Sequence, residues 1–271
     1  MIKYLPDKDY RAIDAISQST LASFSRLTPK EFQHQQQIGF TETPAMLLGT
    51  LVHGMLLDEK SLKDDYAVFE WSESRRTNAY KEAKAKFEED AQGKQIIDQE
   101  TWNFAQNMAN AITDDSNCAL LFPENLVKEH CVLGHEIEGQ AVKGKLDAID
   151  HERKLIIDLK TTGLAFDDDA FKRYATSQNF LIQSAFYLDL MRMETSEEYT
   201  FVFLCVQTKP PFLSRKIIVN PGASPEYIAE GRRLYMDALR QLMICREEDY
   251  WPGFEGKNVI AQLPRWYKGA N

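Results

Sequence analysis

The sequence predicts a mixed α/β fold in which a layer of helices precedes a core that contains a sheet. Apolar residues recur with a helical period up to about residue 115, and from residue 126 they follow the pattern of strands. Strands and helices then alternate, which is typical of an α/β core. With 271 residues and no evident linker, we expect a single domain over residues 1–271. Its helical layer is expected at 1–120 and its α/β core at 121–250.

Four helices are expected in the N-terminal layer. The first has Ser17 or Ser19 as a candidate N-cap and carries apolar residues on one face. The second, AMLLGTLVHGMLLD, is apolar enough to be buried, and the last two are amphipathic and rich in charge. Their expected ranges are 17–38, 45–58, 76–90 and 98–115.

The core is expected to contain five strands and two helices. Turns near Gly134–Gly139 and His151–Arg153 separate the first three strands, and Pro210–Pro211 separates the last two. Ser224 can cap the final helix, with Pro225 at its first position. The expected strands are 126–133, 140–150, 154–160, 199–207 and 214–219, and the expected helices are 168–193 and 224–248.

Composition restricts the class of protein. A hydrophobic content of 44% and a charged content of 27% argue against disorder, collagen and coiled coil. No apolar run is long enough to cross a bilayer, and the N-terminus lacks signal-peptide features, so we expect a cytoplasmic protein without a membrane partner. The four cysteines form no CxxC pair. A net charge of −9 is a weak argument against nucleic-acid binding, because binding depends on a local basic surface.

The segment KGKLDAIDHERKLIIDLKTT carries the strongest chemical signal. Asp147 lies on one expected strand, and Asp158 lies on the next after a short turn. Because residues i and i+2 share a face of a strand, Asp158 and Lys160 project together. Two carboxylates and one ammonium are therefore expected to converge.

This arrangement suits the hydrolysis of a phosphodiester bond. Mg²⁺ prefers oxygen ligands, and Asp147 and Asp158 can bind it with help from the carbonyl of Leu159. The ion can activate water, and Lys160 can orient that water and stabilise the developing negative charge. An Asp two residues from a Lys is common on solvated strands. Here, however, Asp158 ends the apolar run Leu155–Ile157, where an unpaired carboxylate is unfavourable.

Two further features fit the same site, but each is a weak signal by itself. His53 stands in an apolar helix, where a lone histidine is more often a core residue than a ligand. Gln183 and Tyr187 are four residues apart and share a helix face, as chance pairs also do.

Together, these residues resemble the RecB-like branch of the PD-(D/E)xK nuclease superfamily. That branch has a helical GxxxH, a strand GxxD, a strand DxK and a helix QxxxY, in this order. The corresponding residues here are Gly49–His53, Gly144–Asp147, Asp158–Lys160 and Gln183–Tyr187. The resemblance implies a restriction-endonuclease-like fold, a mixed central sheet flanked by helices. It also implies catalytic roles for His53, Asp147, Asp158, Lys160, Gln183 and Tyr187, with His53 as an additional metal ligand or as a residue that positions a second ion.

The chain also resembles the nuclease domains of the exodeoxyribonuclease VIII (RecE) family. The similar sequence segments, which lie between residues 48 and 268, are LGTLVHGMLLDE, SRRTNAYKEA, IIDLKTT, QSAFYLDLM, FVFLCVQ and LPRWYK. The resemblance implies a Mg²⁺-dependent 5′→3′ exonuclease, with Mn²⁺ as a substitute, that acts on ends of double-stranded DNA. It also implies 3′ single-stranded tails for recombination, a RecT-like single-strand annealing partner and a ring-shaped homotetramer.

Some expected residues have competing interpretations. Relatives carry an extra Glu before GxxD, for which Glu129 and Glu136 compete; Glu129 is preferred as a metal ligand because its strand is apolar. Arg75 and Arg76 head an expected helix and fit either a solvated helix start or a phosphate clamp. Lys143 and Lys145 are expected to add basic charge for DNA.

Two alternatives compete with the RecE-like exonuclease. A Cas4-like or other RecB-like nuclease would carry cysteines for an iron–sulfur cluster, and the dispersed cysteines here do not fit one. A non-catalytic DNA-binding relative would have no reason to keep Asp147, Asp158 and Lys160 together.

Overall fold

A mixed central sheet organises the molecule. The computed structural model describes residues 2–256 except 40, 73 and 75, together with residue 261. The strand order is β1-β5-β6-β7-β8-β9, with β2 paired to β6, and most neighbours are antiparallel; β7–β8 and β2–β6 are parallel. The strands are β1 (Ile2–Tyr4), β2 (Ile16–Ser17), β5 (Val127–Ile137), β6 (Gln140–Asp150), β7 (Leu155–Thr162), β8 (Thr200–Gln207) and β9 (Ser214–Val219).

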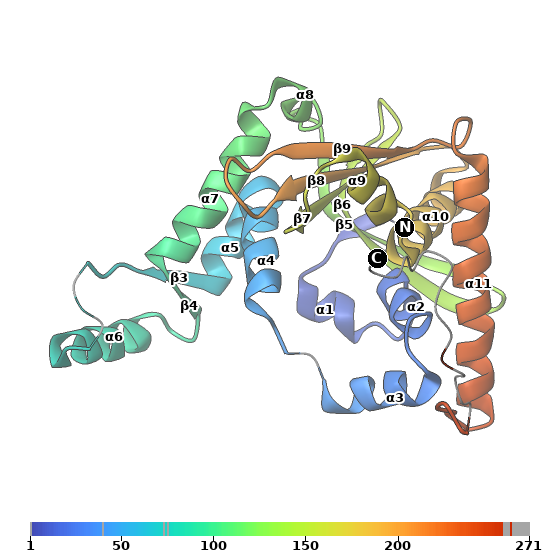
Figure 1. Cartoon of the computed structure of the whole chain (residues 1–271), viewed down its shortest axis with the longest axis horizontal. Helices are drawn as coiled ribbons and strands as arrows, with labels where there is room; N and C mark the ends of the chain where they lie inside the picture. The colour runs from blue at the N-terminus through green and yellow to red at the C-terminus, as the bar shows by residue number, and fades with distance from the viewer. Residues whose placement is uncertain (1, 40, 73, 75, 257–260, 262–271) are drawn as a thin grey trace, which may run out of the picture.

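Helices cover both faces of this sheet, which confirms the predicted fold class (Figure 1). On one face pack α2 (Gln18–Phe24), α10 (Gln178–Thr195) and α11 (Pro225–Glu247). On the other face pack α4 (Pro44–Leu57), α7 (Gln99–Asp114) and α8 (Ser116–Ala119). Successive strand residues point to opposite faces, so Ile156 is buried with the first group and Ile157 with the second.

Two predicted helices are each divided in the structure. The helix expected over 17–38 is split into α2 and α3 (Pro29–Ile38), because Thr28 and Glu31 form a capping box that starts a new helix at Pro29. The helix expected over 168–193 is split into α9 (Asp168–Ala175) and α10, with a break at Thr176 and Ser177.

The first core strand is also longer than predicted. We expected it to end at 133, but β5 continues to Ile137 through an irregularity between Val132 and His135. The chain reverses at Glu138 and Gly139, whose φ angles are 50° and 74°. Positive φ at both residues suits a tight hairpin between twisted strands.

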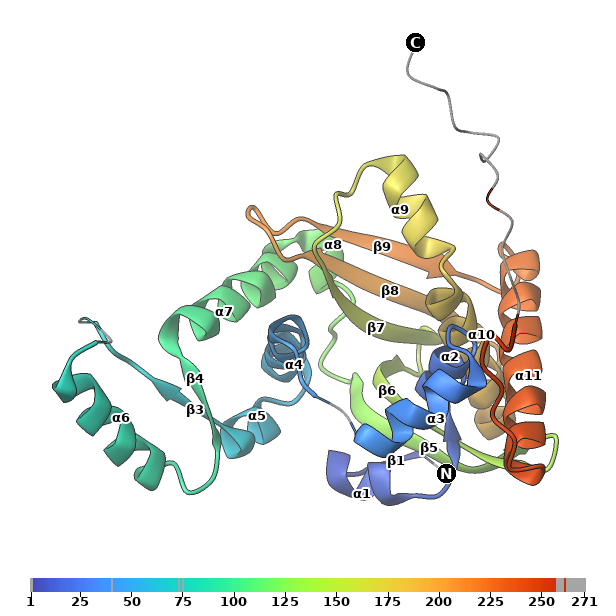
Figure 2. The same ribbon diagram turned by 60° about the horizontal axis from the view of Figure 1, so that its bottom comes forward.

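A projecting arm is the main feature that the sequence did not predict. Figures 1 and 2 show it standing away from the central sheet, connected to it through α7. It contains a parallel pair, β3 (Tyr66–Phe69) and β4 (Gln95–Asp98), and α6 (Asn78–Asp90). The short helices α1 (Asp7–Ala12) and α5 (Glu59–Asp65) were also not predicted.

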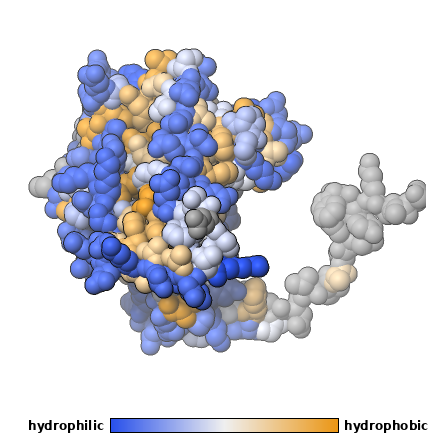
Figure 3. Space-filling view, turned by 90° about the vertical axis from the view of Figure 1, so that its left-hand side faces the viewer, coloured by the Kyte–Doolittle hydropathy of each residue, from blue (hydrophilic) through white to orange (hydrophobic). Residues whose placement is uncertain are grey.

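The surface seen from the side of the arm is mixed in character. In Figure 3, hydrophobic residues gather between ridges of hydrophilic ones. Among the described residues, no helix combines the length and the apolar character needed to span a membrane.

The contact between α10 and α11 depends on a glycine. A Cβ atom at Gly231 would lie 2.1 Å from the backbone oxygen of Leu181, which cannot move without shifting the helix. We expect Gly231→Ala to lower the free energy of unfolding by about 1–3 kcal/mol, as overpacking typically does. Thermal unfolding measures this loss. Gly253→Ala is the control, because the nearest atom to its Cβ is a flexible lysine carbon at 3.5 Å; an equal effect of both substitutions would contradict the packing argument.

Candidate metal centre and active site

Four elements bring the predicted site residues together. His53 comes from α4, Glu129 from β5, Asp147 from β6, and Asp158 and Lys160 from β7. In the β6–β7 hairpin, Ala148 pairs with Ile157, so the next positions outward are Asp147 and Asp158. The short turn predicted from the sequence is therefore what places the two aspartates side by side.

Three of these side chains can ligate one ion. Single ligand atoms of His53, Glu129 and Asp147 all lie within 4.8 Å of one another. Two carboxylates and one imidazole are donors that suit a divalent cation. Among the described residues, this is the cluster of potential metal ligands, and the four cysteines are free and buried.

The hydrogen bonds of His53 determine its tautomer. Nε2 donates to the carbonyl oxygen of Leu159 at 2.9 Å, so Nδ1 turns its lone pair toward Asp147 Oδ2 at 3.4 Å. Burial lowers the pKa of His53, and the nearby Lys160 lowers it further, which favours the neutral ring. A lone pair that faces a carboxylate is repelled unless a cation lies between them. The donor set therefore fits a bound metal ion.

Asp147 is held by the backbone of the next strand. Its Oδ2 accepts a hydrogen bond from the N–H of Leu159 at 2.8 Å. Burial, together with the charge of Asp158, raises the pKa of Asp147 to about 7. Leu159 thus fixes both His53 and Asp147. Its carbonyl, expected from the sequence as a metal ligand, has a second lone pair beyond the one that His53 uses.

Asp158 is nearly inaccessible and is oriented by two partners. It is 4% exposed, and Gln183 Nε2 donates to its Oδ1 at 2.5 Å. Lys160 forms an ion pair with Oδ2, although no hydrogen bond of good geometry from a described residue reaches that atom. Burial opposes the charged form of Lys160, but Asp158 and Asp147 outweigh it and hold its pKa above the ordinary value. Lys160 is therefore cationic at neutral pH.

The helix carrying Gln183 and Tyr187 packs tightly on β6. Tyr187 donates its hydroxyl hydrogen to the carbonyl oxygen of Lys145 at 3.0 Å. A Cβ at Gly144 would lie 2.9 Å from the Tyr187 ring, so the glycine permits this close approach. Both residues of the pair thus orient groups of the site from behind it.

The structure distinguishes the two candidate glutamates. Glu129 lies in the cluster, whereas Glu136 lies seven residues further along β5 and is exposed. Burial raises the pKa of Glu129, and Asp147 adds to this effect, while Lys145 partly offsets it.

The expected basic surface is corrected by the structure. Lys143 is only 7% exposed, and its ammonium donates to the carbonyl oxygens of Tyr10 and Ile13 at 2.9 and 2.7 Å. It therefore offers no free charge to a phosphate. Lys145 is occupied as well, because it pairs with Glu129 and Asp7.

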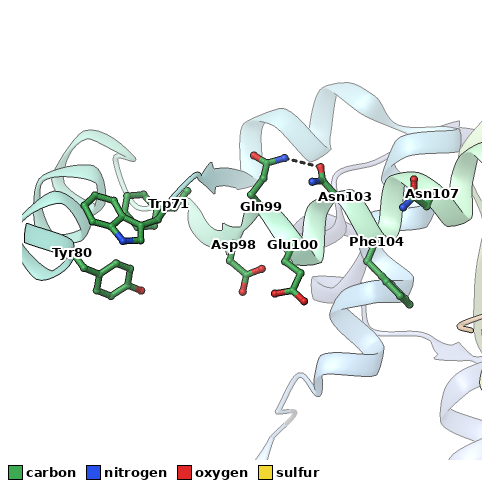
Figure 4. Close-up of a pocket in the computed structure, with 9 residues that line it drawn as sticks. Trp71, Tyr80, Asp98, Gln99, Glu100, Asn103, Phe104 and Asn107 are labelled. Carbon is green, nitrogen blue, oxygen red and sulfur yellow. Dashed lines mark hydrogen bonds between the residues drawn. The ribbon is translucent and has the colours of Figure 1, made fainter. Parts of the chain in front are cut away.

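Of the two expected arginines, the structure describes only Arg76, which is exposed in the turn before α6. Arg75 lies outside the described residues, as does the segment LPRWYK. Figure 4 shows a pocket between this arm and α7, with Trp71 and Tyr80 on one side and Asp98 and Glu100 near its middle. Its two carboxylates do not favour phosphate binding there.

A larger groove lies next to the cluster. It has a volume of about 900 Å³ and runs past Lys145 along α1, α2 and α3. Hydroxyl, amide and guanidinium groups line it, including those of Ser19, Gln33 and Arg246. The carboxylates of Asp7 and Asp14 also line it, but here cationic side chains such as those of Arg246 and Lys145 offset them. Sequence reasoning missed this groove and the part played by Asp7, because no local pattern connects residues 138 positions apart.

Comparisons with known proteins identify the family and the fold. A family described as a PDDEXK-like domain of unknown function (DUF3799) matches residues 17–262. A provisionally assigned exonuclease from Eubacterium rectale has a similar fold, with 17% identity, a TM-score of 0.64 and coverage of 97% of both chains. A phage-related exonuclease from Haemophilus somnus 129PT has 16% identity and a TM-score of 0.36, covering 64% of this chain and 85% of its own. No curated protein matches the chain.

Proposed function

Because this chain belongs to the PDDEXK-like DUF3799 family, we propose that it is a divalent-metal-dependent DNA exonuclease. The observation that carries the proposal is the convergence of His53, Glu129 and Asp147 beside the Lys160–Asp158 pair. A non-catalytic relative would have no use for a half-buried lysine held cationic next to three buried or half-buried carboxylates.

Each residue has a distinct role in this proposal. His53, Glu129 and Asp147 would bind the ion, with Asp158 and the Leu159 carbonyl as the further ligands expected from the sequence. Mg²⁺ fits the carboxylates best, and Mn²⁺ also accepts the imidazole. When bound, the ion neutralises charge on the scissile phosphate and acidifies a bound water.

Lys160 and Gln183 act around Asp158. Gln183 fixes one carboxylate oxygen, and the other lies against the ammonium. Lys160 can therefore donate a hydrogen bond to the attacking water and stabilise the charge that grows on the phosphate oxygens. Tyr187 holds the β6 backbone on which Asp147 stands.

The groove gives a path for the substrate. Its neutral hydroxyl and amide groups can bind phosphate and sugar without much net positive charge. Because the chain carries a net charge of −9, general attraction to DNA is weak, and a closed ring of subunits would retain duplex by enclosing it. We propose the homotetramer, the 5′→3′ direction and the RecT-like annealing partner on the family resemblance.

Digestion of labelled DNA tests the function. With Mg²⁺, the protein should release nucleotides from linear duplex, remove a 5′ label first and leave covalently closed circles intact. EDTA should stop the reaction. Nicking of closed circles, or digestion that continues in EDTA, would contradict a metal-dependent exonuclease, and release of the 3′ label first would reverse the proposed direction. Light scattering that gave a monomer would contradict the ring alone.

Substitution of His53 tests whether this residue is a metal ligand or a structural residue of the core. We expect His53→Ala to raise the Mn²⁺ concentration for half-maximal activity by about tenfold or more, with partial recovery at high Mn²⁺. A lower melting temperature with unchanged activity per folded molecule would assign His53 to the core instead.

A further inference from the structure

Glu129 has an unusual backbone conformation for a strand residue. Its φ angle is 52°, in the left-handed region that residues with a side chain rarely adopt. Its neighbours Lys128 and His130 pair with Ala148 and Leu146 on β6. Glu129, which lies between them, has no paired residue in this ladder. A left-handed non-glycine residue costs roughly 1–2 kcal/mol and persists only where its surroundings hold it.

Lys145 is the group that holds the Glu129 side chain. Its ammonium lies 2.9 Å from Glu129 Oε2 and 2.6 Å from Asp7 Oδ1, so it bridges two carboxylates. Lys145 stands two residues before Asp147 on β6 and therefore projects from the same face. Burial opposes the charged form of Lys145, but the two carboxylates hold its pKa above the ordinary value.

Asp7 belongs to α1, a helix that is attached to the central sheet mainly by contacts with two lysines of β6. None of the residues of α1 is buried, so packing contributes little to its position. Instead, Lys145 binds Asp7 at the start of the helix, and Lys143 binds the carbonyls of Tyr10 and Ile13 near its end. The helix is thus fixed on β6, next to the cluster.

We propose that Asp7 is a positioning residue for the metal site and acts through Lys145 on Glu129. By sharing the ammonium, Asp7 lets Lys145 orient Glu129 without claiming the whole charge of that carboxylate. Without Asp7, Lys145 pairs with Glu129 alone, and its positive charge beside an incoming cation is no longer balanced. Both changes weaken metal binding. The inference rests on the proposed metal role of His53, Glu129 and Asp147.

Metal titration of the full-length protein tests this inference. In calorimetry with MnCl₂, Asp7→Asn should bind Mn²⁺ about tenfold more weakly than the wild type, as substitutions behind a metal ligand typically do. Asp9→Asn is the matched control: Asp9 stands in the same first turn, is exposed, and makes no ion pair with Lys145. It should keep wild-type affinity. Melting without metal measures separately how much stability Asp7→Asn loses by releasing α1 from Lys145.

A double-mutant cycle tests the route through Lys145. In a Lys145→Met background, Asp7→Asn should have no further effect on Mn²⁺ affinity, because the residue that transmits it is gone. Wild-type affinity in Asp7→Asn, an equal loss in Asp9→Asn, or a full Asp7 effect without Lys145 would each overturn the inference. Failure of the wild type to bind Mn²⁺ would instead overturn the proposed metal site itself.

Discussion

Asp147→Asn is expected to abolish metal-dependent cleavage, with a loss of at least about 10³-fold in kcat. This exceeds the roughly 10²–10³-fold typical for one lost electrostatic stabiliser, because the substitution removes an anionic ligand from the ion. The amide oxygen can still accept the hydrogen bond from Leu159, which in the wild type is 2.8 Å long. The geometry of β6 and β7 should therefore survive, and the loss should be chemical.

Thermal stability gives an independent check of the role of Asp147. The substitution that abolishes turnover should leave the stability of the metal-free protein unchanged or raise it. The raised pKa of Asp147, about 7, lies above the ordinary value near 4, so the carboxyl binds its proton more tightly in the folded protein. The free energy of unfolding therefore falls as the pH rises from about 4 to about 7, and the metal-free wild type carries the full cost above that range. At pH 8 without metal, Asp147→Asn should melt at the same temperature as the wild type or higher. Added Mn²⁺ should stabilise the wild type more than the variant.

Glu136→Gln is the matched control for this experiment. Glu136 is the other glutamate that the sequence offered on the same strand, and it is exposed outside the cluster. Its substitution should leave both kcat and the Mn²⁺-dependent shift in melting temperature unchanged. Normal turnover in Asp147→Asn would remove Asp147 from the site, and loss of turnover in Glu136→Gln would show that the cluster is wrongly composed.

The features that could be predicted from the sequence are those that depend on local patterns of residues, such as strands and the short turns between them. Alternating apolar residues identify β6 and β7, and a short connection fixes their pairing, so the approach of Asp147 to Asp158 could be expected. The turn predicted at His151–Arg153 is a four-residue connection that extends to Lys154. The break at Thr28 was also visible, since the threonine precedes Pro29 and Glu31 in a capping-box pattern. That signal was overlooked because the apolar period continues on both sides of it.

Contacts between distant segments could not be predicted in this way. Lys143 was expected to be a surface cation, yet it is buried against carbonyls 130 and 133 residues away. A lysine has the same sequence pattern whether its ammonium meets solvent, a phosphate or a backbone oxygen. The left-handed conformation of Glu129 is equally invisible in the sequence, because the surrounding sheet rather than local preference imposes it.

Lys160→Met is expected to lower kcat by about 10²–10³-fold while KM for DNA changes little. The ammonium is held beside Asp158, within the reacting centre and away from the groove that would carry the DNA backbone. A group that stabilises charge only in the transition state affects turnover rather than substrate binding. Removing the ammonium leaves the buried Asp158 carboxylate without its cation, so the metal-free variant should also melt earlier. Lys172→Ala, on the exposed side of α9, is the control and should leave both constants unchanged. Steady-state kinetics on linear duplex decide the matter: a variant with a raised KM and a normal kcat would make Lys160 a DNA-binding residue and leave the attacking water without an assigned partner.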